Sequence, residues 1–219
     1  MRSVRHDKKA MPENIIREYI RIVDSIYGVF LDGCQGFSSA KSLFEQSQLL
    51  NLERNRKLLA ENQPTSTVHY NSTINDFDDS CIIYSKGKKG ESDYRILHYC
   101  PTQAEYKRRN STGGENYRFI GNIALITIYE YWENSCRNKL ASYHGVKQKH
   151  IRSQIFGDLR ILRNSIIHHR GIALPEIEKC KEFNWYKTDD AIFINGDQME
   201  DIVAAIKQSR LSLYVIEQA

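Results

Sequence analysis

Three residues that can act on a phosphate group lie close together in the sequence: Arg163, Asn164 and His168. The imidazole of histidine takes up and releases protons near neutral pH. The planar guanidinium group of arginine donates parallel hydrogen bonds to two phosphate oxygens. An amide beside them can orient the imidazole or a phosphate oxygen. Together these residue types point to proton transfer at a phosphate.

One amphipathic helix is expected to carry these three residues. Apolar residues recur at helical spacing and define one face of that helix: Ile151, Ile155, Leu159, Leu162 and Ile166. Because successive positions turn by about 100°, Arg160, Asn164 and His168 line up on the opposite side. Arg163 flanks that polar stripe. Gly171 follows closely and is suited to a left-handed C-cap, so the polar residues converge at the end of the helix.

The same cluster also fits a solvated helix end without any chemistry. Cations in the last helical turn suit the negative end of the helix dipole, and His168, His169 and Arg170 occupy that turn. His169 is turned about 100° away from His168, so it is expected to cap the helix or line a groove. The residues alone leave both interpretations open.

The segment Arg163-Asn164-Ser165-Ile166-Ile167-His168 resembles the motif of the HEPN superfamily. That motif consists of an arginine, an adjacent polar residue that is often asparagine, and a histidine a few positions later, at the end of a bundle helix. A glycine often follows, as Gly171 does here. The likeness extends upstream to Tyr129-Glu130-Tyr131-Trp132-Glu133, an aromatic segment that carries acids, and downstream to an extended segment and a final helix.

The resemblance implies a helical bundle and a metal-independent ribonuclease, because many members are such enzymes in toxin–antitoxin, CRISPR and abortive-infection systems. It implies that Arg163, Asn164 and His168 are catalytic and that neither a metal nor another cofactor takes part. Two such motifs commonly face each other across a dimer. A homodimer with a composite site is therefore expected.

Four further residues are expected to support the site: Arg160, His169, Glu130 and Glu133. The two glutamates interrupt the apolar surface of a predicted helix, and burying a carboxylate without a partner is costly. One of them is therefore expected to pair with Arg160 or Arg163 and to orient its guanidinium group.

The predicted fold is mainly α. It is an HEPN-like helical bundle in a single domain, residues 1–219, with a β-rich insertion at 65–105 and a short C-terminal hairpin. Apolar periodicity predicts helices over 12–31, 38–61, 116–144, 151–171 and 197–213, with a break at the glycines of 33–36. Strand-like composition marks 65–74, 81–85 and 94–100, and the hairpin is expected to pair 185–187 with 191–194. Asp197 with Glu200 resembles a capping box that starts the last helix.

Basic residues in and just after the insertion are expected to contact RNA phosphates: Lys88, Lys89, Lys107, Arg108 and Arg109. Tyr106 lies beside three of them and could stack on a base. The same residues also fit an ordinary solvated turn and linker, so the sequence leaves their role open.

Composition narrows the class of protein. The net charge of +4 permits a polyanionic partner without requiring one. The five cysteines are odd in number and form no C-x-x-C pair, so neither a disulfide framework nor a zinc knuckle is indicated, and a reducing cytoplasm fits best. The longest apolar run, at 123–129, is far shorter than the roughly 20 residues of a membrane helix, so no membrane partner is expected.

The function expected is therefore metal-independent cleavage of RNA by attack of its own 2′-OH, in a toxin–antitoxin or anti-phage defence system. One alternative is a non-catalytic HEPN-like module that binds an antitoxin, a nucleotidyltransferase or a defence effector through the polar helix end. Another is an unrelated helical protein in which the motif is a coincidence.

Overall fold

The structure is a computed structural model that describes residues 3–61, 72–100, 102–209 and 212–217. Its contacts divide the chain into two compact units, Met1–Gly33 with Arg118–Ala219, and Cys34–Tyr117. The mainly α-helical fold with small β elements is confirmed, because the strands in the described residues form only two-stranded sheets. The assignment of 1–219 to one domain with an insertion at 65–105 stays a prediction.

The first helix, α1 (Ser3–Ala60), runs through the break that the sequence predicted at 33–36. It also begins ahead of the predicted start at Pro12. A glycine inside a helix costs roughly 1 kcal/mol relative to alanine, which weakens a helix without ending it. A Cβ built at Gly36 meets nothing within 4 Å, so no packing contact forces the chain to turn there. The prediction of two separate helices was wrong for this reason.

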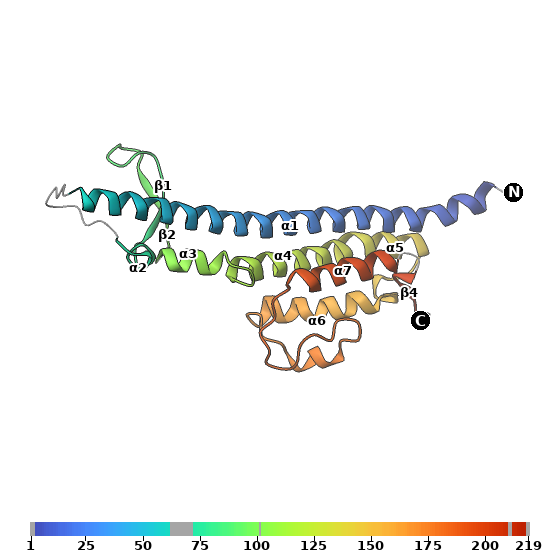
Figure 1. Cartoon of the computed structure of the whole chain (residues 1–219). Helices are drawn as coiled ribbons and strands as arrows, with labels where there is room; N and C mark the ends of the chain where they lie inside the picture. The colour runs from blue at the N-terminus through green and yellow to red at the C-terminus, as the bar shows by residue number, and fades with distance from the viewer. Residues whose placement is uncertain (1–2, 62–71, 101, 210–211, 218–219) are drawn as a thin grey trace. The chain divides into compact units, whose positions relative to one another are not determined.

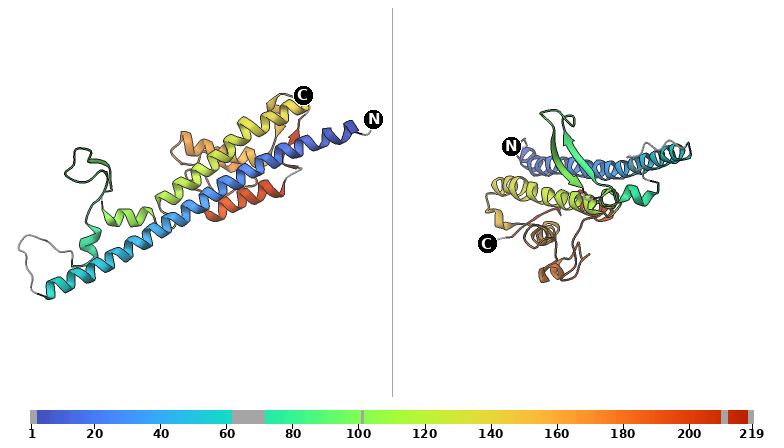
Figure 2. Two further views of the ribbon diagram at one scale, coloured as in Figure 1. Left: turned by 90° about the horizontal axis from the view of Figure 1, so that it is seen from above. Right: turned by 90° about the vertical axis from the view of Figure 1, so that its left-hand side faces the viewer.

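The first unit is a bundle built on the N-terminal half of α1. The helix predicted at 116–144 is present as α4 (Glu115–Tyr131), η1 (Trp132–Cys136) and α5 (Arg137–His144), where η1 is a π-helical turn that the sequence did not indicate. The helix predicted at 151–171 is α6 (Gln154–His168), and the last helix is α7 (Gly196–Gln208). In Figures 1 and 2, α4 and α7 run alongside the N-terminal half of α1, and in Figure 1 α6 lies below α4 and α7.

Three aromatic rings from three elements form the centre of this bundle. The rings of Trp132 and Phe156 stack at 3.9 Å between centroids, and the Tyr19 ring meets both edge-on. The Tyr19 hydroxyl donates a hydrogen bond of 3.0 Å to the carbonyl oxygen of Ile128. Burying side chains of this size contributes about 1.5–3 kcal/mol each. This core fixes α6 against α4 and η1.

The apolar face predicted for α6 packs into the bundle. Ile155, Leu159 and Leu162 are buried, as is Ile151 just before the helix, whereas Ile166 is partly exposed. Ahead of α6 lie η2 (Gln148–His150) and β3 (Ile151–Arg152), and β3 pairs antiparallel with β4 (Val215–Ile216). A 3-10 turn, η3 (Pro175–Lys179), follows α6. The polar stripe of α6 is thereby left facing away from the core.

The predicted hairpin of 185–187 with 191–194 is wrong. A turn does form, because the amide of Asp190 donates to the carbonyl oxygen of Lys187 at 3.1 Å, but the segments around it do not pair as strands. Instead Ala191 bridges to Ile172. The segment after α6 takes part in this pairing, because the amide of Ile192 donates to the carbonyl oxygen of Gly171 at 2.7 Å.

Helix α4 also holds this C-terminal segment. The side chain of Asn122 accepts from the amide of Ile194 at 3.0 Å and donates to the carbonyl oxygen of Ile192 at 3.3 Å, as a neighbouring strand would. A Cβ at Gly121 would lie 1.9 Å from the carbonyl oxygen of Ile194, so only glycine allows this approach. A side chain from a helix has therefore taken the place of the expected strand.

The start of α7 is capped two residues earlier than predicted. Asn195 is the N-cap, and its side chain accepts from the amide of Gln198 at 2.9 Å, while the Gln198 side chain accepts from the amide of Asn195 at 3.1 Å. Asp197 and Glu200 do not form the predicted capping box. Asparagine serves as well as aspartate at this position, which explains the shifted boundary.

The second unit contains the C-terminal half of α1 and a small antiparallel hairpin. Its strands, β1 (Ile82–Lys86) and β2 (Arg95–Cys100), match two of the predicted strands. Most of the third predicted strand, 65–74, lies outside the described residues. Two short helices, α2 (Ile74–Asp78) and α3 (Gln103–Arg109), complete the unit. Gln48 of α1 joins them, because it donates to Asp78 at 3.0 Å and to Gln103 at 2.7 Å.

Among the helices in the described residues, none combines the length and the apolar character that crossing a membrane requires.

Candidate active site

The structure brings the three motif residues together at the C-terminal end of α6. Nη1 of Arg163 lies 3.2 Å from Oδ1 of Asn164 and 3.4 Å from Nε2 of His168. Nη2 of the same guanidinium group lies 2.9 Å from Oε1 of Glu130 on α4. Arg163 is thus the centre of the cluster, because every other member contacts its guanidinium group.

The expected pairing of a glutamate with an arginine is found between Glu130 and Arg163. The second carboxylate oxygen of Glu130 accepts from Nδ2 of Asn134 at 2.7 Å, which fixes the carboxylate from the other side. The side chains of Arg163 and Glu130 are 25% and 38% exposed. An ion pair this accessible contributes about 1 kcal/mol or less to stability. The main effect of this ion pair is to orient the guanidinium group of Arg163.

The guanidinium group keeps unused capacity to donate. Nε of Arg163 is buried from solvent and has no hydrogen-bond partner among the described residues. An unsatisfied buried donor costs roughly 1–3 kcal/mol. His168 is exposed, and its Nε2 can accept from Arg163 when that nitrogen carries no proton. The cluster is therefore accessible to a ligand.

The chain turns sharply directly after this cluster. Arg170 has φ 56° and Gly171 has φ 77°, so two successive residues adopt the left-handed conformation. Gly171 has the backbone conformation the sequence predicted, but Arg170 adopts it first, at a cost of about 1–2 kcal/mol for a residue with a side chain. The amides of His169 and Gly171 both donate to the carbonyl oxygen of Ser165 at 3.1 Å and close the helix end.

His169 is the C-cap residue of α6 and lies outside the regular helix. With His168 it borders a shallow depression of about 550 Å³ that the segment around Ala173 and Asp189 completes. The sequence placed His169 on another side of the helix from His168. Both residues nevertheless line the same depression, but of these two histidines only His168 contacts Arg163.

Glu133 and Arg160 do not join the cluster. Both carboxylate oxygens of Glu133 accept from Nη1 of Arg137 at 2.9 Å, and Nε of Arg137 donates to the carbonyl oxygen of Ile151 at 2.9 Å. Arg160 makes no hydrogen bond or ion pair within the described part of the chain. The spacing of four residues between Glu133 and Arg137 is the helical pairing signal that the sequence analysis overlooked.

Two buried polar residues that the sequence analysis did not single out hold the site in place. The carboxylate of Asp158 is 1% exposed and accepts from the amides of Lys181 at 2.7 Å, Glu182 at 2.7 Å and Phe183 at 3.2 Å. The hydroxyl of Ser165 accepts from the amide of Leu174 at 3.4 Å. An aspartate on the apolar side of a predicted helix was the signal for this role, because such a carboxylate needs partners.

The predicted RNA-binding residues belong to the second unit, and two of them are neutralised there. Nζ of Lys107 lies 2.6 Å from Asp78, and Arg108 pairs with Glu105 at 2.7 Å and with Glu115. Arg109 donates to the Tyr84 hydroxyl at 3.2 Å.

Lys88 and Lys89 lie in the turn between β1 and β2 and are exposed. Neither forms an ion pair with any described residue. Of the five predicted residues, these two have the charge most available to a phosphate. That the five contact RNA stays a prediction.

The described residues contain no group of three or more His, Cys, Asp or Glu side chains arranged to hold a metal ion. No family model matches this chain, and neither the characterised proteins nor the solved structures yield a significant match to it. The HEPN resemblance therefore stays a hypothesis carried by the motif, and the chemistry has to be argued from the geometry.

Proposed function

We propose that this protein is an endoribonuclease of the HEPN type that cleaves RNA without a metal, through attack of the 2′-OH on the adjacent phosphorus. One observation carries the proposal: a single guanidinium group, that of Arg163, contacts Asn164, His168 and Glu130 at an exposed helix end. A cation that binds phosphate is thereby placed beside an imidazole that moves protons.

The reaction needs three things from the protein. The proton of the 2′-OH must be removed, the charge that builds on the phosphoryl oxygens must be stabilised, and the departing 5′-oxygen must receive a proton. His168 suits the proton transfers, which typically contribute 10²–10⁴-fold. Arg163 suits the charge, because a guanidinium group donates charge-assisted hydrogen bonds to phosphate oxygens. Asn164 holds the guanidinium group from the side opposite to Glu130.

A homodimer is part of this proposal. One cluster holds one imidazole, whereas removal of one proton and delivery of another at opposite sides of the phosphorus are best served by two. A two-fold axis would bring a second His168 to the same phosphate. Exposed apolar side chains on α4, near the end of α6 and just after it support such an interface: Ile123, Tyr131, Ile167 and Ile172. Ile123 shares a face of α4 with Glu130, seven residues later.

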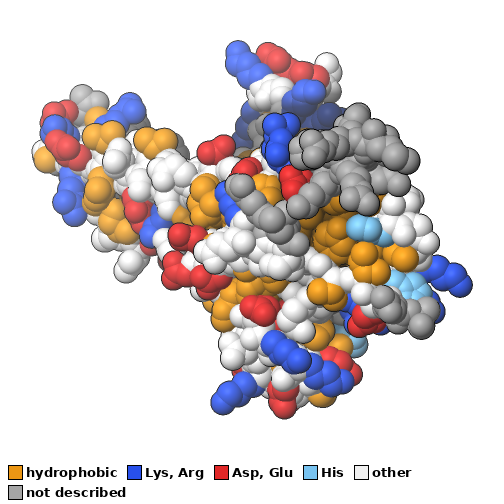
Figure 3. Space-filling view, turned by 90° about the vertical axis from the view of Figure 1, so that its right-hand side faces the viewer, with side chains coloured by type: hydrophobic (Ala, Val, Ile, Leu, Met, Phe, Trp, Pro, Cys, Tyr) orange, Lys and Arg blue, Asp and Glu red, His pale blue; other side chains and the backbone are white. Residues whose placement is uncertain are grey.

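The surface charge is consistent with binding a polyanion through local sites. In the described part of the face that Figure 3 draws, Lys and Arg side chains are spread among acidic and apolar ones. The net charge is only +4. Affinity for RNA is then expected to come from a few individual cations that contact phosphates. A strongly positive electrostatic potential over the whole surface is not expected. The setting we propose is a cytoplasmic toxin–antitoxin or anti-phage defence system with a protein partner that restrains the nuclease.

The second candidate is a non-catalytic module that binds an antitoxin, a nucleotidyltransferase or a defence effector. The ion pair of Arg163 with Glu130 favours it, because a neutralised arginine can serve as a polar anchor at an interface. The exposed apolar side chains near the cluster would fit a protein partner equally well.

Incubation of the purified protein with mixed RNA in EDTA, with matched single-stranded DNA as the control, separates the two candidates. The proposal expects RNA fragments with 2′,3′-cyclic phosphate ends and intact DNA. Cleavage of both nucleic acids, or cleavage that appears only with a divalent metal, would contradict the mechanism. Intact RNA at high protein concentration would favour the binding module.

A further inference from the structure

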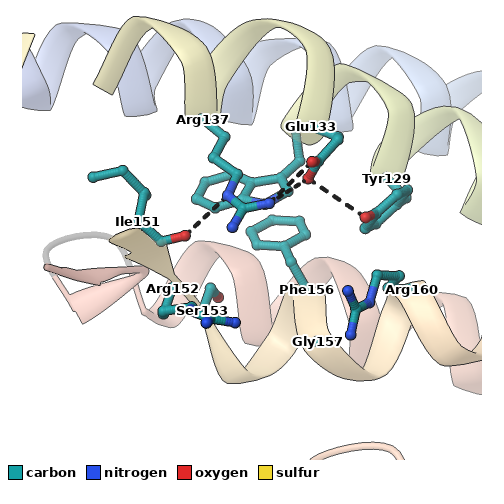
Figure 4. Close-up of a pocket in the computed structure, with 10 residues that line it drawn as sticks. Tyr129, Glu133, Arg137, Ile151, Arg152, Ser153, Phe156, Gly157 and Arg160 are labelled. Atoms are coloured by element: carbon teal, nitrogen blue, oxygen red, sulfur yellow. Dashed lines mark hydrogen bonds and ion pairs between the residues drawn. The ribbon is translucent and has the colours of Figure 1, made fainter. Parts of the chain in front are cut away.

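The polar stripe of α6 does not end at the cluster. Going back along the helix from His168 and Asn164, the same face carries Arg160, Gly157 and Ser153, at intervals of three or four residues. Arg160 lies eight residues before His168, which is about 12 Å along the helix axis. This stripe leads from the cluster to a pocket of about 70 Å³ between α6 and the η1–α5 segment, shown in Figure 4.

Cations, open helix backbone and the aromatic core residues Trp132 and Phe156 line the pocket. Arg137, Arg152 and Arg160 border it, and in Figure 4 the last two reach it from the α6 side. Gly157 contributes no side chain, and a Cβ built on it meets nothing within 4 Å, so the helix backbone is open between the arginines. Ser153 is the N-cap residue, yet its side chain makes no capping hydrogen bond.

The acidic groups near the pocket are already engaged. Glu133 lines it, but both of its oxygens accept from Arg137. Glu217 accepts from Nε of Arg152 at 3.1 Å. Both side chains of this ion pair are more than half exposed, so the pair is weak and a phosphate can replace Glu217. Arg160 has no such partner among the described residues. Three arginines therefore line the pocket, two of them paired with the carboxylates of Glu133 and Glu217, and the cation without a carboxylate partner is Arg160.

We infer that this pocket binds a phosphate group of the same RNA strand that is cleaved at His168. The inference rests on the proposed function for the identity of the strand. Guanidinium groups, a free hydroxyl and a helix N-terminus all favour an oxyanion. The pocket has room for a few water molecules, which suits one phosphate group and excludes a nucleobase. The backbone would lie along the polar stripe of α6, with Arg160 as a residue that binds RNA and takes no part in the chemistry.

The test uses a labelled 2′-O-methyl oligoribonucleotide of mixed sequence, which keeps the phosphates but has no attacking hydroxyl. Two variants disturb the pocket: Arg160→Ala removes the unpaired cation, and Gly157→Glu places a carboxylate in the open space. Arg17→Ala, an exposed arginine on α1, is the matched control for the loss of one charge. Equal thermal midpoints show that the variants are folded.

Arg160→Ala is expected to weaken binding by about tenfold more than the control and to reduce the slope of log affinity against log salt by about 0.7, the value for one phosphate on a single strand. Gly157→Glu should weaken binding further, and Arg160→Lys should restore part of it. The cleavage rate of unmodified RNA at saturation should stay within about threefold of wild type.

The outcomes separate this site from the proposed function. If the wild type cleaves RNA but Arg160→Ala binds the oligonucleotide as Arg17→Ala does, the phosphate site is wrong and the nuclease stands. If no RNA is cleaved but Arg160→Ala still loses binding, the nuclease is wrong and the phosphate site stands. A cleavage rate that collapses in Arg160→Ala with unchanged binding would place Arg160 in the chemistry and overturn the inference, as would a wild type that does not bind the oligonucleotide.

Discussion

Glu130 and Arg163 are separated by 33 positions in sequence, yet a carboxylate oxygen of one lies 2.9 Å from a guanidinium nitrogen of the other. The contact joins α4 to the end of α6 and sets the direction in which Arg163 presents its remaining donors. Because Arg163 also touches His168, this ion pair is the positional link between the core of the bundle and the proposed chemistry.

The first prediction concerns that link. Glu130→Gln keeps the shape of the side chain and removes its charge, so Arg163 should lose part of its fixed orientation. We expect the single-turnover cleavage rate to fall by about tenfold, while the free energy of unfolding changes by less than about 1 kcal/mol. Glu18→Gln, which breaks an exposed ion pair with Lys139, is the control and should leave the rate unchanged. Equal rates for the two variants would remove Glu130 from the site.

The second prediction concerns the buried carboxylate of Asp158. Asp158→Ala leaves the amides of Lys181, Glu182 and Phe183 without an acceptor, which should cost about 3–5 kcal/mol of stability. Urea unfolding monitored by circular dichroism measures this. Asp201→Ala, an exposed position on α7, is the control and should cost under about 0.5 kcal/mol. Similar losses in both variants would mean that the carboxylate does not hold this segment.

The third prediction uses two glycines with opposite surroundings. Gly121→Ala should destabilise the protein by about 1–3 kcal/mol, because the added Cβ meets the carbonyl oxygen of Ile194 at 1.9 Å. Gly28→Ala should stabilise it by about 0.5–1 kcal/mol, because its Cβ meets nothing within 4 Å and alanine favours the helix. Thermal unfolding of the pair measures both. A stabilised Gly121→Ala protein would show that the C-terminal segment does not pack on α4.

The fourth prediction concerns two buried thiols. Burial raises the pKa of Cys136 and of Cys180 to about 12, from an ordinary value of 9.0. A raised pKa in the folded state means that the folded protein keeps these protons above pH 9 while the unfolded chain loses them. Stability should therefore fall as pH rises from about 9 towards 12, by up to roughly 1.4 kcal/mol per thiol for each pH unit.

Replacement of both cysteines with alanine isolates this contribution. The pH dependence between 9 and 12 should flatten in the double variant, even though its stability at pH 7 is lower. In the wild type at pH 8, mass spectrometry should find both thiols unmodified after treatment with iodoacetamide under native conditions, and alkylated after unfolding. Rapid native alkylation of either thiol would contradict its burial.

The helical bundle could be predicted from apolar periodicity because each of its main helices buries one continuous face. Gly121 and Asn122 have roles that apolar periodicity does not predict. Their role depends on the backbone of 192–194, a segment some 70 positions away, and no local pattern reveals such a contact. The same holds for the hairpin that did not form, since pairing of Ala191 with Ile172 depends on how the chain leaves α6.

The candidate cluster, too, could be predicted only in part. Local spacing placed Arg163, Asn164 and His168 near one helix end, and the cost of burying a carboxylate predicted a glutamate partner. Which glutamate it would be could not be decided, because Glu130 and Glu133 lie within one turn of each other. The pairing of Glu133 with Arg137 left Glu130 to Arg163. The spacing of four residues between Glu133 and Arg137 signals that pairing, whereas the π-helical turn of η1 has no signature in a single sequence.

The most direct test of the nuclease proposal is the single-turnover rate of RNA cleavage in EDTA for wild type, His168→Ala and His169→Ala, each shown to bind 2′-O-methyl RNA equally well. His168 contacts Arg163 and His169 does not. We expect the first variant to be slower by about 10²–10⁴-fold, with the second within about tenfold of wild type, and all products to end in 2′,3′-cyclic phosphate. Full activity in the His168→Ala protein would contradict the proposal.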